Sequence, residues 1–123
     1  MSLILVIDDD SLLRTTLRAV LERMGHQVVL AEHGQRAVQI MNEPLKAPDL
    51  VITDMVMPEM DGLEVIHYFR THHPNIPIIA ISGEMPESFL HLAGRLGARA
   101  TMRKPLLAAE LSETVERLLM TKV

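Results

Sequence analysis

Five side chains that could do chemistry together are spread over most of this 123-residue sequence. Three are carboxylates, one is a hydroxyl and one is an amine: Asp8, Asp9, Asp54, Ser82 and Lys104. Carboxylates that are held close together repel one another, and a divalent cation relieves that repulsion. Oxygen ligands without cysteine or a suitably spaced histidine favour Mg²⁺. The set therefore predicts a negatively charged magnesium site that contains one lysine.

The same combination fits one class of substrate, the phosphoryl group. Phosphoryl oxygens need charge neutralisation and little further chemistry, and an aspartate can accept the group covalently. Asp54 would be the acceptor, and the acyl phosphate would be held by the cation, by Lys104 and by the Ser82 hydroxyl. Each residue alone is weak evidence, because acidic residues are common after strands. Their positions after four separate strands are stronger evidence.

The hydrophobic pattern predicts how the chain brings these residues together. Short apolar runs typical of strands lie at 3–7, 27–31, 50–52, 76–81 and 99–102. Helical patterns separate and follow them, at 11–24, 34–42, about 62–71, 86–96 and 107–120. Alternating strands and helices predict an α/β fold, a doubly wound five-stranded parallel sheet with five flanking helices. The carboxyl ends of such strands meet at the crevice where these sheets bind ligands.

Composition narrows the class of protein. The chain is 48% hydrophobic and 23% charged, as in an ordinary soluble domain, and it is long enough for one domain with its own core. The absence of cysteine excludes disulfides and thiolate metal sites. A net charge of −4 and only three aromatic residues argue against direct nucleic-acid binding. No apolar run reaches the roughly 18 residues of a membrane span and no signal peptide is evident, so we expect a cytoplasmic protein without membrane contact.

Four motifs give the chain a resemblance to a known family. ILVIDDD, VITDMVMPEMDG, IIAISG and RKP occur in the order and spacing of the receiver domain of two-component response regulators, the chemotaxis-receiver-like superfamily. The resemblance implies a flavodoxin-like strand order 2-1-3-4-5 and one receiver domain over residues 1–123, with no effector domain in this chain. It implies a phosphorylation-activated signalling switch. Such a domain is no enzyme apart from catalysing its own phosphoryl transfer and dephosphorylation.

The resemblance also implies the roles of the acidic residues. Asp54 would accept a phosphoryl group from a histidine kinase or a phosphotransfer protein. Mg²⁺ would be ligated by Asp9, by Asp54 and by the backbone carbonyl of Val56, while Asp8 would assist through water. These assignments go beyond what residue types and spacing establish alone.

Signalling beyond the site is implied to pass through Ser82. Ser82 would bond a phosphoryl oxygen and move on activation, Lys104 would pair with the phosphate, and the Lys104-Pro105 bond is often cis in this family. A downstream effector domain or protein, or a homodimer formed on phosphorylation, would then read the change. The family's usual partner surface comprises the fourth helix, the fifth strand and the fifth helix, which here include His91, Arg95, Thr101 and Glu113.

Two positions depart from the family pattern. Receivers usually carry Tyr or Phe three residues before the lysine, and rotation of that ring reports phosphorylation. Thr101 stands at that switch position here, which puts coupling through a ring in doubt but leaves the phosphorylation chemistry unaffected. Arg99 and Ala100 replace a common acidic pair, which weakens the case for the salt-bridged dimer of some transcriptional subfamilies.

Two other functions fit parts of the pattern. Asp8-Asp9-Asp10 resembles the D-x-D start of a haloacid-dehalogenase-like phosphatase, in which Asp8 would be the nucleophile and Asp10 the acid. However, Leu12 stands where Thr or Val is expected, and no pair of acids follows the lysine. A degenerate receiver would serve only as a docking module, but the presence of all five chemical side chains argues against it.

Overall fold

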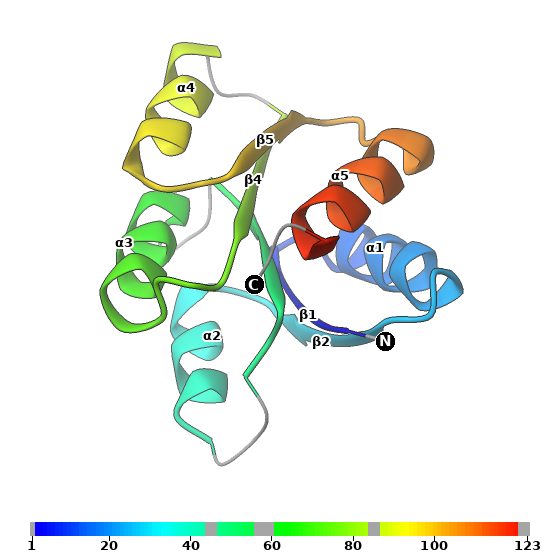
Figure 1. The fold of residues 1–123 in the computed structure, drawn as a ribbon, viewed down its shortest axis with the longest axis horizontal. Coiled ribbons are helices and arrows are strands. Elements are labelled where there is room, and N and C mark those ends of the chain that lie inside the picture. The colour runs from blue at the N-terminus through cyan, green and yellow to red at the C-terminus, as the bar shows by residue number, and fades with distance from the viewer. Residues whose placement is uncertain (1, 44–46, 56–60, 84–86, 121–123) are drawn as a thin grey trace.

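Five strands and five helices alternate along the chain, as the hydrophobic pattern predicted (Figure 1). The computed structural model describes residues 2–43, 47–55, 61–83 and 87–120. The strands are β1 (Leu3–Ile7), β2 (Gln27–Ala31), β3 (Leu50–Asp54), β4 (Ile78–Ser82) and β5 (Ala100–Arg103). The helices are α1 (Ser11–Arg23), α2 (Gly34–Met41), α3 (Gly62–His72), α4 (Glu87–Leu96) and α5 (Ala108–Met120). Within those ranges, no helix has the length and apolar character needed to cross a bilayer.

All strand pairs are parallel, and the order across the sheet is β2-β1-β3-β4-β5. This confirms the predicted doubly wound, flavodoxin-like topology. The registers align the strand ends, because Ile7 pairs with Thr53, Asp54 with Ile81 and Ser82 with Arg103. The carboxyl ends of β1, β3, β4 and β5 therefore lie along one edge of the sheet.

The sheet separates two apolar layers. Figure 1 shows the helices that cover them, α2, α3 and α4 on one face and α1 and α5 on the other. Side chains alternate across a strand, so Leu5 and Ile7 of β1 pack with α2, α3 and α4, whereas Ile4 and Val6 pack with α1 and α5. Strands β3 and β4 are buried along their whole length. Burial on both faces explains why their sequences are almost continuously apolar rather than alternating.

The strands that carry the site differ slightly in their bounds from the predicted runs. Asp54 and Ser82 are the last residues of β3 and β4, although the apolar pattern stopped before them. Both polar residues continue the ladder, and Met55 N–H still donates to Ile81 O at 3.0 Å. β4 begins at Ile78, two residues later than the apolar run, because Pro77 has no N–H to contribute to a ladder.

Helix caps fix the turns that surround this edge. Asp10 caps α1 by accepting from the N–H groups of Leu12 and Leu13, and Asp61 caps α3 by accepting from Glu64 N–H at 3.0 Å. Aspartate is among the preferred N-cap residues. His33 caps α2 through its Nδ1, which accepts from Arg36 N–H at 3.1 Å. Histidine is not a preferred capping residue, so the sequence did not predict this role.

Candidate functional site

Side chains from four strand ends meet at the carboxyl edge of the sheet. Asp8 follows β1, Asp54 and Ser82 end β3 and β4, and Lys104 follows β5. One carboxylate oxygen from each of Asp8, Asp9 and Asp54 lies within 4.8 Å of the others. Asp8, Asp54 and Ser82 are 0%, 4% and 2% exposed, whereas Asp9 is open to solvent. The edge therefore holds a largely buried acidic pocket with one accessible carboxylate.

The turn between β1 and α1 fixes Asp8. Its N–H donates to Ala31 O of the neighbouring strand at 3.1 Å, and its Oδ1 accepts from Asp10 N–H at 2.9 Å. The guanidinium of Arg14 donates to its backbone carbonyl through Nη1. Both the backbone and the side chain of Asp8 are thus held in place.

Asp54 is held by its neighbour in sequence and enclosed by the start of α3. Its Oδ1 accepts from Met55 N–H at 2.9 Å. Gly62 N–H donates to Met55 O at 3.2 Å, and a Cβ on Gly62 would lie 2.6 Å from both Asp54 O and Met55 Cα. Only glycine allows this approach of two backbone segments. The sequence placed Gly62 at the start of a predicted helix, but nothing in it indicated this contact.

Lys104 is the cationic member of the site. Its Nζ lies 3.4 Å from Asp8 Oδ2 and 3.6 Å from Asp54 Oδ1. Its backbone N–H donates to Ser82 O at 2.9 Å, so the pairing of β4 with β5 fixes the backbone position from which the lysine side chain extends. A Cβ on Gly83 would lie 3.3 Å from Lys104 Cβ, which shows how closely the lysine stem passes this glycine. The Lys104-Pro105 peptide bond is cis.

Burial and crowding shift the pKa values of the site. Burial and then the charge of Asp8 raise the pKa of Asp54 to about 6. Burial also raises the pKa of Asp8, although the hydrogen bond from Asp10 N–H opposes it. Burial would lower the pKa of Lys104, but the carboxylates of Asp8 and Asp54 outweigh it and raise that pKa. One ammonium group thus faces two buried carboxylates, Asp8 and Asp54, with a third carboxylate, Asp9, beside them.

This donor set fits Mg²⁺. Mg²⁺ prefers oxygen ligands and uses few carboxylates. Asp8 Oδ2 is buried and accepts no hydrogen bond from the described part of the chain, although the Lys104 ion pair lies opposite it. An additional positive charge would therefore stabilise the pocket. Val56, whose carbonyl was predicted as a ligand, lies outside the described residues.

The two predicted switch residues occupy different surroundings. Ser82 is buried at the site edge, whereas Thr101 is exposed and pairs with Ala80 in the sheet. Thr101 lines a hollow of about 400 Å³ together with residues of α4 and α5, among them His91 and Glu110. The structure thus brings Ser82, but not Thr101, into the acidic pocket.

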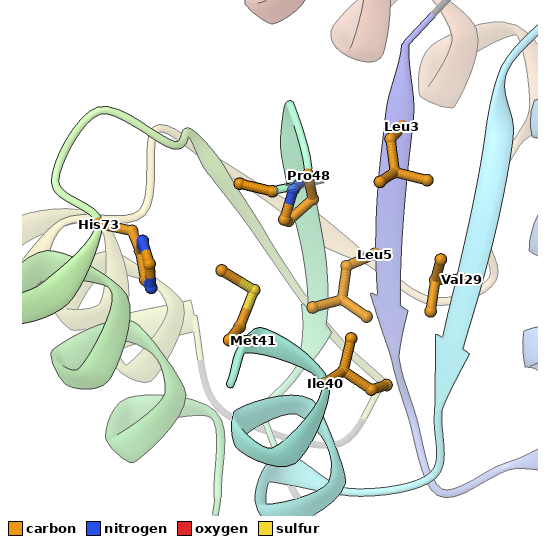
Figure 2. Close-up of a pocket in the computed structure, with 8 residues that line it drawn as sticks. Leu3, Leu5, Val29, Ile40, Met41, Pro48 and His73 are labelled. Carbon is orange, nitrogen blue, oxygen red and sulfur yellow. The ribbon is translucent and has the colours of Figure 1, made fainter. Parts of the chain in front are cut away.

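An apolar cavity of about 290 Å³ lies near the amino ends of the strands (Figure 2). Leu3 and Leu5 of β1 and Ile40 and Met41 of α2 face each other across it, and His73 lies at its side. Among the residues that the structure describes, those lining the cavity include no carboxylate, hydroxyl or lysine. It lies toward the opposite end of the strands from Asp54.

The chain matches the family model of the response regulator receiver domain over residues 4–116. The chemotaxis protein CheY homolog of Campylobacter jejuni subsp. jejuni is 36% identical over 123 residues, which cover 96% of this chain and 92% of that protein. The alkaline phosphatase synthesis transcriptional regulatory protein PhoP of Bacillus subtilis is 33% identical over 116 residues, which cover 94% of this chain and 48% of that protein. The chain therefore spans about half the length of PhoP.

Solved structures share the fold along almost the whole chain. A receiver domain protein from Clostridium thermocellum has a TM-score of 0.93 at 30% identity, covering 99% of this chain and 97% of that one. The receiver domain of NtrX from Brucella abortus has a TM-score of 0.89 at 32% identity, covering 96% and 98%. The predicted architecture is thus that of known receiver domains.

Proposed function

The chain belongs to the response regulator receiver domain family, and from that premise we propose that Asp54 is the phosphoryl acceptor of a two-component phosphorelay. Receiver domains are signalling switches rather than classical enzymes, and they bind Mg²⁺ at an acidic pocket. One observation carries the assignment to Asp54. Its carboxylate is buried at the centre of the strand edge, 3.6 Å from Lys104 Nζ and beside Asp8 and Asp9.

The transfer would be a displacement at phosphorus. A carboxylate oxygen of Asp54 attacks the phosphorus of a phosphohistidine in a histidine kinase or phosphotransfer protein. The new O–P bond forms as the N–P bond breaks, and the imidazole leaves with the electron pair of that bond. Asp54 must be ionised to attack, and a pKa of about 6 leaves it a carboxylate at neutral pH. Lys104 supplies positive charge on the side of Asp54 Oδ1.

Asp8, Asp9 and Asp54 would hold Mg²⁺, together with the carbonyl of Val56 that the family resemblance implies. When bound, Mg²⁺ neutralises charge on the phosphoryl oxygens. The chain's own contribution is to present these ligands: Asp8 is fixed by three hydrogen bonds, and Asp9 is accessible to an incoming ion. Ser82 would donate its hydroxyl to a phosphoryl oxygen once the acyl phosphate has formed.

We expect Mg²⁺ and acetyl phosphate to add one base-labile phosphoryl group to the folded protein, because an acyl phosphate is hydrolysed by base. Intact mass measurement before and after brief alkaline treatment would detect it. Asp54→Asn should give no adduct, since the amide is not a nucleophile, whereas Asp10→Asn should give the wild-type adduct. Asp10 is exposed and is the N-cap residue of α1.

Absence of an adduct on the folded wild type, or equal adducts on wild type and Asp54→Asn, would contradict the assignment. A phosphatase that used Asp8 would instead release phosphate steadily and become labelled at Asp8. A degenerate receiver would give neither result. Proteolytic mapping of the labelled peptide separates these outcomes.

The phosphodonor would dock in an apolar groove beside the site. The groove has a volume of about 320 Å³, and Asp10 and Lys104 are among its lining residues. The others include Leu13, Thr16 and Val20 of α1 on one side and Leu106, Ala108 and Leu111 on the other. A helix of the donor seated here would bring its histidine beside Lys104, the residue that pairs with Asp54. The apolar lining and its continuity with the site support this docking mode.

Thr16→Arg should therefore slow phosphoryl transfer from a phosphorylated protein donor by about tenfold, the size of one lost interface contact, because the arginine would fill the groove. The rate with acetyl phosphate should not change, since this small donor needs no docking surface. Thr15→Arg is the matched control: Thr15 is exposed on the same helix but does not line the groove. Equal rates for both variants with the protein donor would exclude this docking mode.

The output would pass from Ser82 to the surface formed by α4, β5 and α5. Ser82 O accepts from Lys104 N–H at 2.9 Å, and β4 pairs with β5 through Thr101, so a shift of Ser82 would move β5. The exposed residues His91, Arg95, Thr101 and Glu113 would present this change to an effector domain or protein, or to a second phosphorylated copy. We assign residues 1–123 to the receiver domain and place the exchange in the cytoplasm, where histidine kinases draw on ATP.

A further inference from the structure

Arg14 reaches back from the first turn of α1 to the acidic turn of the site. Its backbone N–H donates to Asp10 O at 3.0 Å and closes that turn. Side chains on a helix tilt toward its N-terminus, and the guanidinium accordingly donates through Nη1 to the carbonyl of Asp8. We propose that Arg14 is a positioning residue of the site, which fixes Asp8 and thereby the pocket that takes Mg²⁺. This inference rests on the proposed function.

The contacts of Asp8 show why such a residue is needed. Its side chain is completely buried, and its Oδ2 accepts no hydrogen bond from the described residues. Three hydrogen bonds set the direction of Asp8: Asp8 N–H donates to Ala31 O, Asp10 N–H donates to Asp8 Oδ1, and Arg14 donates to Asp8 O. Of the three residues that bond to Asp8 in this way, only Arg14 does so through its side chain. Its loss would leave the Asp8 carbonyl free to rotate with the turn.

Arg18, one turn further along α1, provides the contrast. Arg18 forms a surface pair with Glu22 at 3.6 Å, and both side chains are 52% exposed. Such pairs contribute little. Arg14 is half-buried, and its charge is directed to a backbone carbonyl rather than to a carboxylate within the described ranges. Hydrogen bonds from an ionised donor are roughly twice as strong as neutral ones. The bond from Arg14 to Asp8 O is also less exposed to solvent than the Arg18–Glu22 pair, so Arg14 has the stronger hold on its partner.

The positive charge of Arg14 and its contact with Asp8 have opposite effects on Mg²⁺ binding. A guanidinium near the pocket repels a divalent cation, so removal of the charge alone would tighten binding. Removal of a residue that holds a ligand in place weakens metal binding by about 10–100-fold. The direction of change in Mg²⁺ affinity therefore distinguishes a positioning role from a simple charge effect.

The test is a calorimetric titration of the whole protein with Mg²⁺ in the absence of any phosphodonor. Arg14→Met keeps most of the aliphatic stem but removes the charge and the hydrogen bond, and we expect about tenfold weaker Mg²⁺ binding. Arg14→Lys keeps the charge but lacks the planar fork, and we expect a smaller loss in the same direction. Arg18→Met removes the same charge from the same helix and should bind Mg²⁺ as the wild type does.

Equal or tighter Mg²⁺ binding by Arg14→Met would overturn the inference, as would an equal loss in Arg18→Met. If Arg14→Met does not fold, Arg14→Lys decides alone, because wild-type affinity in that variant excludes positioning by the guanidinium. Hydrogen exchange of the Asp10 amide without Mg²⁺ is a second readout and should be faster in Arg14→Met than in Arg18→Met or the wild type. A wild type that binds Mg²⁺ but forms no adduct would refute the proposed function. The difference in Mg²⁺ affinity between the Arg14 and Arg18 variants would still test the positioning role of Arg14.

Discussion

Gly62→Ala is expected to destabilise the protein by roughly 3 kcal/mol, at the upper end for an overpacked buried site. The added Cβ would lie 2.6 Å from Asp54 O and from Met55 Cα. Both of these are backbone atoms in or beside a fully buried strand, so neither can move aside cheaply. Either α3 withdraws from the sheet or the end of β3 shifts. Urea unfolding followed by circular dichroism measures the loss.

The same substitution should slow phosphorylation of Asp54, because the shift falls on the residue that carries the acceptor. Gly94→Ala is the matched control: it lies within α4, and a Cβ there would meet nothing within 4 Å. Alanine favours a helix over glycine by about 1 kcal/mol, so this variant should be slightly more stable and fully phosphorylated. Equal stability of Gly62→Ala and the wild type would show that the start of α3 and the end of β3 can move apart without cost in free energy.

Asp54→Asn is expected to stabilise the metal-free protein at pH 8 by up to about 3 kcal/mol, the equivalent of a two-unit pKa shift. Burial and the charge of Asp8 raise the pKa of Asp54 from 3.8 to about 6. The folded protein therefore holds this proton more tightly than the unfolded chain does. Stability that is present below pH 4 is lost as the pH rises toward 6, where the buried carboxylate forms. Asparagine carries no such charge.

The gain in stability from Asp54→Asn should thus disappear as the pH is lowered from 8 to 4. Thermal unfolding in EDTA at several pH values in this range measures it. Excess Mg²⁺ should stabilise the wild type at pH 8, because the ion binds the folded carboxylates, and should narrow the difference from Asp54→Asn. Asp10→Asn controls for the amide itself, since Asp10 is exposed and asparagine caps helices as well as aspartate does. A gain that is independent of pH would contradict a charge effect.

The sheet and the acidic pocket were predictable because both follow from local pattern. Apolar runs predicted the strands, and polar residues at their ends identified Asp8, Asp54, Ser82 and Lys104 as neighbours. β5 was the least evident strand, because it lies at an edge and buries only Met102. The ends of β3 and β4 were predicted too early, since a buried polar residue continues a ladder without continuing an apolar run.

Other features of the site depend on distances between segments that no local pattern encodes. Gly62 approaches Asp54 O through the packing of α3 on β3, and any glycine at the start of a helix has the same sequence signature without that contact. Arg14 is half-buried on α1, whereas residue type alone would suggest that an arginine in this helix is exposed to solvent. Its hydrogen bond to Asp8 O becomes visible only when the turn and the helix are placed together.

The position of β5 at the end of the sheet limits how partners can recognise this protein. β5 is four residues long and has exposed side chains at Thr101 and Arg103, and short, charged edges resist the addition of another strand. Recognition at this surface would then depend on side chains, with no shared backbone ladder. Substitutions on the exposed face of β5 could redirect the protein to a different binding partner while the buried residues around Asp54 stayed the same.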